Sequence, residues 1–205
     1  MIIGGASGLG KQIQNYLKKK NKVFFSSSKK INKKNKNIAI KYDIFSKEDF
    51  NQLKNFIIKK KINIIFYCVG YKKINSLQDM IYTDLIVPVQ LIEYLNKKIK
   101  YKVKFILSGS QSPYHRLSSE NYQISKSMQY NLVKFYNDKS SRIILLIIKY
   151  GTLLFPKSKW QLRINKNSKI LKTKKKLNFK KIQSYYSLFD KIVNLKKIKS
   201  KIYKI

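Results

Sequence analysis

The stretch IIGGASGLGKQI, residues 2–13, decides the fold, because Gly4, Gly8 and Gly10 lie between an apolar run and a segment of helical periodicity. One glycine permits a tight turn and another lets the backbone approach a phosphate group closely. The helix that follows offers unpaired N–H groups and the positive end of its dipole. Any tight turn from strand to helix also needs glycine, so the glycines alone are a weak signal. The strand before them and the helix after them make a phosphate-binding turn the better interpretation.

Short apolar runs alternate with helix-patterned segments along the rest of the chain. The runs predict strands at Met1–Ile3, Val23–Ser26, Ile38–Tyr42, Ile62–Val69, Val103–Leu107 and Ile143–Lys149, with a further one at the terminal KIYKI. The periodic segments predict helices from Leu9 to Leu17, Ser46 to Lys60, Met80 to Asn96, Tyr122 to Tyr136 and Leu188 to Leu195. Strands that alternate with helices indicate an α/β protein, with a parallel sheet covered on both faces.

The length and composition fit one domain over residues 1–205, with a variable loop at about 152–183 where the periodic pattern weakens. No apolar run is long enough to cross a membrane, and the amino terminus does not resemble a signal peptide. Cys68 is the only cysteine, which favours a reducing cytoplasm, and its apolar surroundings predict an inert buried thiol. One histidine and one cysteine cannot build a metal site.

The chain is strongly basic, with 46 Lys and Arg against nine Asp and Glu and a formal net charge of +37. Such a charge raises the possibility of nucleic-acid binding. The lysines, however, are spread among asparagine and isoleucine from end to end, and the arginines are only Arg116, Arg142 and Arg163. We therefore expect a solvated surface rather than a nucleic-acid interface, with Lys172–Lys181 as the best candidate for an anion-binding exception.

A second motif, YQISK at residues 122–126, places Tyr122 and Lys126 one helical turn apart on the same face. Together with the glycine turn, this pair resembles the short-chain dehydrogenase/reductase family, and the likeness runs in order along nearly the whole chain. The resemblance implies a Rossmann-type doubly wound sheet, with helices on both faces in three layers. It also implies hydride transfer between a nicotinamide cofactor and a substrate carbon, which interconverts a carbonyl and an alcohol.

The resemblance assigns cofactor-binding positions residue by residue. Asp43 of YDIF, with Ile44, stands where family members hold the adenine ring, and Gly70 of YCVG stands where Asn-Asn-Ala-Gly is usual. Gly151 follows the sixth strand in place of Pro-Gly. The remaining expected cofactor contacts are Gly4, Ser7, Gly8, Leu9, Gly10, Ser28, Lys29, Tyr122 and Lys126. Because Ser28 and Lys29 follow the second strand and no acid does, electrostatics favour NADP, although NAD is possible.

The catalytic roles also follow from the resemblance. Tyr122 would exchange the alcohol proton, and the Lys126 ammonium would favour its phenolate and hold the nicotinamide ribose. A serine would bind the substrate oxygen; the usual spacing falls on Gly109, so Ser110 is favoured over Ser108. Tyr122 and Lys126 could instead be ordinary helix packing and surface charge.

One position departs from the family in charge. Asp84 stands where an asparagine often holds a water in the proton relay, and its carboxylate could pair with Lys126 and compete with the activation of Tyr122.

Pro88, four residues later, predicts a kink or a late start of that helix. The short first strand would also leave the amine of Met1 partly buried, which is costly unless it is paired. Either translation begins further upstream or the strand is stunted.

Three other interpretations remain. A catalytically impaired homologue would bind a dinucleotide for a structural or sensing role, a basic module would bind nucleic acid, and a longer relative would be a sugar-nucleotide epimerase or reductase. The three-residue gap between Gly4 and Gly8, and the small size, argue against the last. The loop with Trp160 and many lysines hints at an acidic or phosphorylated substrate, and His115 could line the site. The family implies a homodimer or homotetramer.

Overall fold

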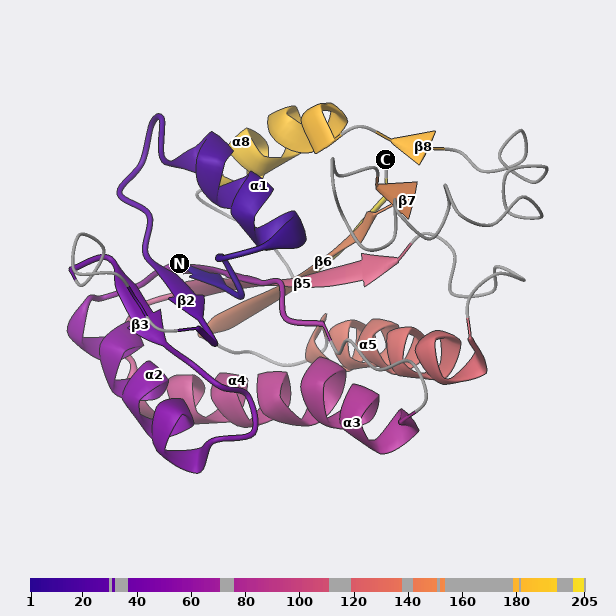
Figure 1. The fold of residues 1–205 in the computed structure, drawn as a ribbon, viewed down its shortest axis with the longest axis horizontal. Helices are drawn as coiled ribbons and strands as arrows, with labels where there is room; N and C mark the ends of the chain where they lie inside the picture. Colours follow the sequence, from indigo (N-terminus) through magenta and orange to yellow (C-terminus); the bar gives the residue numbers. More distant parts are fainter. Residues whose placement is uncertain are drawn as a thin grey trace.

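The computed structural model describes residues 1–29, 31, 37–70, 76–110, 119–137, 142–150, 152–153, 179–180, 182–194 and 201–204. At its centre is a seven-stranded, all-parallel sheet of order β3-β2-β1-β4-β5-β6-β9 (Figure 1). Its strands are β1 (Ile2–Ile3), β2 (Phe25–Ser27), β3 (Ala39–Lys41), β4 (Ile64–Tyr67), β5 (Val103–Ser110), β6 (Ile143–Tyr150) and β9 (Lys201–Lys204). Every predicted strand is present, with bounds shifted by a few residues. A small parallel pair that was not predicted joins β7 (Thr152–Leu153) to β8 (Phe179–Lys180).

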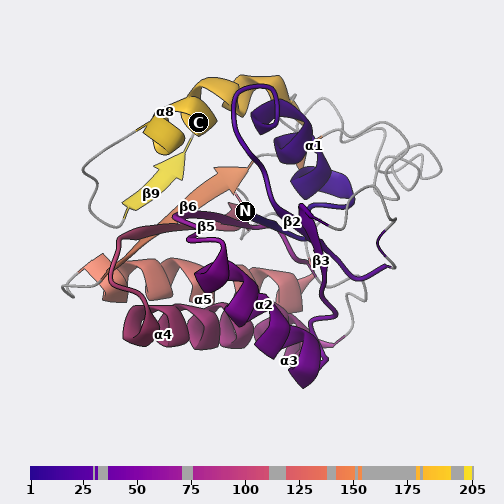
Figure 2. The same ribbon diagram turned by 90° about the vertical axis from the view of Figure 1, so that its left-hand side faces the viewer.

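Helices cover both faces of the sheet, as Figures 1 and 2 show from two directions. On one face lie α1 (Gly8–Leu17) and α8 (Tyr186–Asn194), which follows a short 3-10 helix (Ile182–Tyr185). On the other lie α2 (Lys47–Lys59), α4 (Val87–Lys98) and α5 (Glu120–Asn137); α3 (Leu77–Ile81) and a π-helical turn (Tyr82–Ile86) run directly into α4. The α/β prediction of three layers is confirmed. Among the described residues, no helix has the length and apolar character to cross a lipid bilayer.

The apolar alternation along the strands separates two cores, one for each face. Ile2 points into the core beneath α1 and α8, whereas Ile3 points into the core beneath α2, α4 and α5. In the same way, Leu107 faces α5 and Ile106 faces α1 and α8. Residues two apart on a strand share a face, so this parity also fixes where the polar residues at the strand ends point.

The order of the strands determines where a ligand can bind. The chain builds β1, β2 and β3 in one direction, then returns to place β4 on the other side of β1. At such a reversal, the connections that leave the carboxyl ends of the two central strands diverge to opposite faces of the sheet. Here these strands are β1 and β4, which pair Ile2 with Phe66 and Ile3 with Tyr67. The glycine turn therefore begins at this reversal.

Helix α2 shows how local sequence signals set the element bounds. The Ser46 hydroxyl accepts a hydrogen bond from the Asp49 N–H at 3.1 Å and caps the helix at the residue where its start was predicted. The Asp49 carboxylate, however, accepts the Asp43 N–H at 2.8 Å instead of returning to the Ser46 N–H. The capping box is thus half formed, and its acid holds the segment that follows β3.

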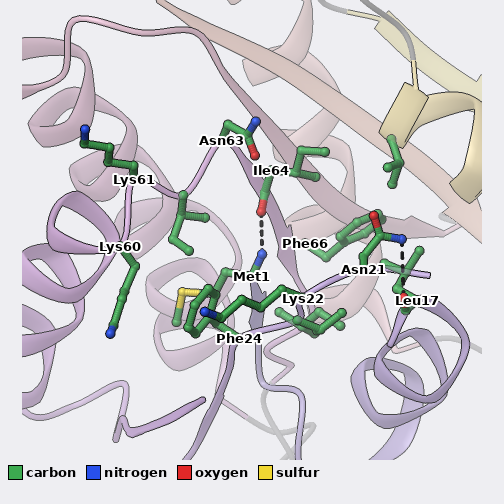
Figure 3. Close-up of a pocket in the computed structure, with 14 residues that line it drawn as sticks. Met1, Leu17, Asn21, Lys22, Phe24, Lys60, Lys61, Asn63, Ile64 and Phe66 are labelled. Carbon is green, nitrogen blue, oxygen red and sulfur yellow. Dashed lines mark hydrogen bonds between the residues drawn. The ribbon is translucent and has the colours of Figure 1, made fainter. Parts of the chain in front are cut away.

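The amino end of β1 is buried, as the sequence indicated. Met1 is 8% exposed, and its amine donates a hydrogen bond to the Ile64 carbonyl at 2.5 Å (Figure 3). Desolvation lowers the pKa of this amine from 8.0 to about 5, because burial penalises the charged form. The amine lies in the lining of a hollow of about 180 Å³ together with Lys22, Phe24 and Lys60. That volume is well below the roughly 300–1,000 Å³ of an ordinary ligand pocket.

A free amine at Met1 makes stability depend on pH. Between pH 5 and pH 8 the folded state binds fewer protons than the unfolded state, so the free energy of unfolding should rise with pH, by up to about 4 kcal/mol. Urea unfolding at both ends of this range measures the rise. A chain acetylated at Met1 has no titrating amine and is the control. An equal pH dependence in the two forms would contradict the burial of a neutral amine.

Candidate functional site

The glycine turn is fixed by close backbone contacts. Gly4 and Gly8 have positive φ angles, +81° and +52°, which side chains disfavour. The Gly4 N–H donates to the Ser26 hydroxyl at 3.0 Å, and the Gly5 N–H donates to the Ser26 carbonyl at 3.0 Å. A β-carbon on Gly10 would overlap the carbonyl oxygen of Gly4 and lie 3.0 Å from the Gly5 α-carbon. The turn therefore depends on glycine at both ends.

The first turn of α1 is arranged to accept an anion. Ser7 occupies the N-cap with an extended backbone, and its hydroxyl makes no capping hydrogen bond. The first turn carries no acidic residue, although acids commonly occupy this position. Ser7 is exposed and Leu9 is half-buried. These features fit the phosphates of a dinucleotide, for which a helix amino end after a glycine turn is a frequent site.

Contacts across two strands connect the glycine turn to α5. A β-carbon on Gly4 would lie 3.1 Å from the carbonyl of Cys68, which follows β4. The Ser108 hydroxyl, on β5, donates to the Tyr67 carbonyl at 3.0 Å and lies 3.6 Å from the Cys68 sulfur. The Ser108 carbonyl in turn accepts a hydrogen bond from the Lys126 ammonium at 3.2 Å. The two sequence motifs, 112 or more residues apart in the chain, therefore meet at one edge of the sheet.

Tyr122 and Lys126 lie together on α5, as their spacing predicted. The Lys126 nitrogen is 5.6 Å from the centre of the Tyr122 ring, and Tyr122 is half-buried. Lys126 is only 6% exposed, so it is not surface charge. Burial lowers its pKa, but the Asp84 carboxylate and the phenols of Tyr122 and Tyr130 outweigh that effect, and its pKa is raised above the ordinary value. The side chain therefore remains an ammonium.

The pairing of Asp84 with Lys126 is observed. Their charged atoms are 2.9 Å apart, and the Ser125 hydroxyl donates to the same carboxylate oxygen at 2.6 Å. Asp84 is 4% exposed, and its second carboxylate oxygen is buried with no hydrogen-bond partner among the described residues. A buried charge with one orphaned oxygen depends strongly on its counter-ion. Lys126 also lies 3.4 Å from the Gln129 side-chain oxygen.

Pro88 explains how Asp84 reaches this position. The predicted kink takes the form of a π-helical turn, in which the Val87 N–H donates to the carbonyl of Tyr82, five residues back. Pro88 has no N–H, so one carbonyl of this turn loses its intrahelical donor. The Tyr67 hydroxyl donates to the Thr83 carbonyl at 2.7 Å, and the Gln129 amide donates to the Asp84 carbonyl at 2.9 Å. Both carbonyls are thus satisfied from neighbouring elements.

The two candidate serines differ in their surroundings. Ser108 and Ser110 share one face of β5, while Gly109 faces Tyr130 on α5. The Ser108 hydroxyl is engaged by the Tyr67 carbonyl. The backbone of Ser110 is held instead, because the Tyr130 hydroxyl accepts from its N–H at 3.0 Å and donates to its carbonyl. Ser110 remains the predicted site serine.

The other predicted cofactor residues lie at strand ends on the same edge. Ser28 and Lys29 follow β2 and are exposed. Asp43 is exposed, and its carboxylate accepts the Phe45 N–H at 3.1 Å; Ile44 beside it is half-buried. Gly70 is exposed, with no atom near its β-carbon position. Three predicted residues lie outside the described residues, namely Gly151, His115 and Trp160. So do most of the predicted loop at 152–183 and most of the basic run 172–181 within it.

Cys68 is half-buried, not fully buried as predicted, but desolvation raises the pKa of its thiol to about 12 and makes a nucleophilic thiolate unfavourable. Sequence reasoning missed Ser125, Gln129 and Tyr130, which organise the site. Ser125 lies within the YQISK motif and Gln129 is three residues after it, and a buried acid at position 84 requires hydrogen-bond donors from neighbouring elements. The need for these donors was a signal in the sequence that could have found Ser125 and Gln129. No sequence signal indicated the hydrogen bonds between Tyr130 and Ser110.

The chain matches a family model, the NAD dependent epimerase/dehydratase family, over residues 1–159. The three-residue gap between Gly4 and Gly8 and the small size of the chain argued against an epimerase-type relative. The match shows that these two features do not exclude such a relative. No curated protein matches the chain in sequence.

Solved structures from both branches are similar in fold. MoeE5 in complex with UDP-glucuronic acid and NAD superposes with a TM-score of 0.73 at 13% identity, covering 100% of this chain and 75% of that one. A short chain dehydrogenase family protein from Francisella tularensis gives 0.70 at 18% identity, covering 100% and 95%. UDP-glucose 4-epimerase of Thermus thermophilus with NAD gives 0.67 at 13% identity, covering 100% and 76%. At these identities the likeness establishes the Rossmann-type fold alone.

Replacing Gly10 tests the geometry of the turn. Gly10→Ala should lower stability, because overpacking against fixed backbone costs about 1–3 kcal/mol. The overlap of a β-carbon with the Gly4 carbonyl oxygen puts the cost in the upper part of that range, above the roughly 1 kcal/mol that alanine gains over glycine inside a helix. Thermal unfolding measures the change. Gly70→Ala, at a position with open space, is the matched control and should leave the melting temperature nearly unchanged. Equal stability of native protein and Gly10→Ala would contradict the close approach of α1 to Gly4.

Proposed function

Because the chain belongs to the NAD-dependent epimerase/dehydratase family, within the short-chain dehydrogenase/reductase group, we propose that it is an NAD(P)-dependent oxidoreductase that interconverts a carbonyl and an alcohol. The observation that carries this proposal is the meeting of the two motifs. The glycine turn and the Tyr122–Lys126 pair lie at the same edge of the sheet, linked through Cys68 and Ser108. An anion-accepting turn and a phenol beside a buried ammonium are the two parts that such a reaction requires.

Each part of the site has a proposed role. The nicotinamide, when bound, supplies or accepts the hydride. Tyr122 gives or takes the proton of the substrate oxygen, and Ser110 binds that oxygen. The Lys126 ammonium favours the phenolate form of Tyr122 and holds the ribose. The phosphates lie on the turn formed by Gly4, Ser7, Gly8, Leu9 and Gly10, with Asp43, Ile44 and Gly70 toward the adenine and ribose.

The preference for NADP over NAD rests on electrostatics. No acid follows β2 among the described residues, and Lys29 is exposed there. An acid at this place binds the ribose hydroxyls of NAD, whereas a cation accommodates the extra phosphate of NADP. MoeE5 and the Thermus thermophilus epimerase are in complex with NAD, so NAD is the competing cofactor.

A second candidate function has its own supporting observation. Asp84 places a negative charge beside Lys126, and this charge opposes formation of a phenolate at Tyr122. A catalytically impaired homologue that binds a dinucleotide for a structural or sensing role would tolerate such a pair. This candidate predicts cofactor binding without turnover against a broad panel of carbonyl and alcohol compounds, including sugar nucleotides.

The role of Tyr122 is tested by removing only its hydroxyl. Tyr122→Phe should lower kcat by about 10²–10⁴-fold, the usual contribution of a general acid or base, while the Kd for NADPH stays within about twofold. Steady-state kinetics and nicotinamide fluorescence measure the two quantities. Tyr136→Phe, further along α5, is the matched control and should turn over normally. Undiminished turnover by Tyr122→Phe would rule out the proton-transfer role.

The cofactor preference is tested by titrating NADPH and NADH separately. The native chain should bind NADPH more tightly. Lys29→Glu should weaken NADPH binding by about fivefold or more, since an exposed ion pair contributes up to about 1 kcal/mol and its reversal adds repulsion. Lys18→Glu, an equal charge change at the end of α1, is the control and should leave the ratio of the two Kd values unchanged. A native chain that binds NADH more tightly would contradict the NADP preference.

A further inference from the structure

The carboxylate of Asp84 is held in one position by its neighbours. One oxygen accepts from the Ser125 hydroxyl at 2.6 Å and lies 2.9 Å from the Lys126 nitrogen. Both partners come from the same turn of α5, and all three side chains are buried or nearly so. The carboxylate thus fixes the ammonium at a defined place against the end of β5, where it also donates to the Ser108 carbonyl.

The backbone that carries Asp84 is equally constrained. The carbonyls of Thr83 and Asp84, in the π-helical turn before Pro88, accept hydrogen bonds from Tyr67 on β4 and Gln129 on α5. These hydrogen bonds come from two different elements. Asp84 therefore cannot move away from Lys126 by a simple rotation of its own segment. The ion pair is part of the rigid frame and not a surface contact formed by chance.

The pair also changes the charge of the site. A lysine alone would place one uncompensated positive charge beside Tyr122, whereas Asp84 and Lys126 together are neutral. The other groups near the pair are the phenols of Tyr67, Tyr122 and Tyr130 and, over the Tyr130 ring, the Lys149 ammonium at 4.2 Å. Asp84 is thus the sole acid that faces Lys126 among the described residues.

The oxidised and reduced nicotinamides differ by one positive charge on the ring. In a site of low dielectric, an uncompensated ammonium would disfavour the oxidised ring, and a nearby carboxylate offsets that effect. We infer that Asp84 is a positioning residue of the proposed reaction: it holds Lys126 in place and cancels its charge, which strengthens binding of the oxidised cofactor relative to the reduced one. This inference rests on the proposed function.

The first experiment separates charge from shape. Asp84→Asn keeps the size of the side chain and an oxygen acceptor for Lys126 and Ser125, but removes the charge. The Kd of NADP⁺ divided by the Kd of NADPH should rise about tenfold in this variant, as expected for loss of one charge at the effective dielectric of a protein site. Asp84→Glu, which restores the charge, should return the ratio toward the native value.

Asp190→Asn is the matched control, because Asp190 bonds to Tyr16 and Lys20 on the other face of the sheet. It removes one negative charge without touching the site and should leave the ratio unchanged. A ratio that stays within about twofold of native in Asp84→Asn, or that shifts equally in Asp190→Asn, would overturn the inference about charge.

The second experiment needs no cofactor. Thermal unfolding of Asp84→Asn, Lys126→Met and the double variant forms a cycle that reports the coupling of the two side chains. Of the three variants, Lys126→Met should have the lowest melting temperature, because it leaves a buried carboxylate without a counter-ion. Adding Asp84→Asn should restore part of the lost melting temperature. Additive losses would overturn the positioning role. If the native chain binds neither cofactor, the proposed function and the charge effect fail together, and the cycle still decides whether Asp84 holds Lys126.

Discussion

Pro88 has no amide hydrogen to give to the helix that contains it, and the arrangement of the site follows from that omission. The helix has a π-helical turn directly before Pro88, and the carbonyls of Thr83 and Asp84 accept hydrogen bonds from β4 and α5. A buried carbonyl without a donor would cost about 1–3 kcal/mol, so these ties are necessary. They also bring the side chain of Asp84 against Lys126. A local defect in one helix is thereby converted into a fixed connection among three elements.

The resulting ion pair has a price in stability and an effect on chemistry. Two charges that leave water lose several kcal/mol of solvation each, which good geometry only partly restores. Ser125, Gln129 and the Ser108 carbonyl supply additional hydrogen bonds, yet one oxygen of Asp84 stays unsatisfied among the described residues. Such an arrangement is poorly explained by stability alone. Its most direct consequence is electrostatic, because Lys126 keeps its proton while its charge is balanced.

Much of the fold followed from sequence, because periodicity and glycine placement act locally. The alternation of Ile2 and Ile3 between two cores, the capped start of α2 and the shared face of Tyr122 and Lys126 all follow from the spacing of neighbouring residues. The possible pairing of Asp84 with Lys126 was also foreseen from charge. The form of the irregularity at Pro88 could not be foreseen, because it depends on whether hydrogen-bond donors such as Tyr67 and Gln129 lie within reach. The tie between Tyr130 and Ser110 and the pair of β7 with β8 are likewise long-range contacts without a local pattern.

The two ends of β1 show how the fold concentrates constraint at the site. At the carboxyl end, the turn is held by two hydrogen bonds that its N–H groups donate to Ser26, by the backbone near Cys68 and by the close approach of Gly10 to Gly4. At the amino end, the Met1 amine donates a single hydrogen bond to the Ile64 carbonyl beside a hollow. Burial lowers the pKa of this amine, which favours its neutral form. A strand of only two residues can still sit at the centre of the sheet because β2 and β4 flank it and both of its side chains are fully buried. The carboxyl end of β1 is therefore the more firmly held of the two, and under the proposed function it is the end beside the phosphates of the cofactor.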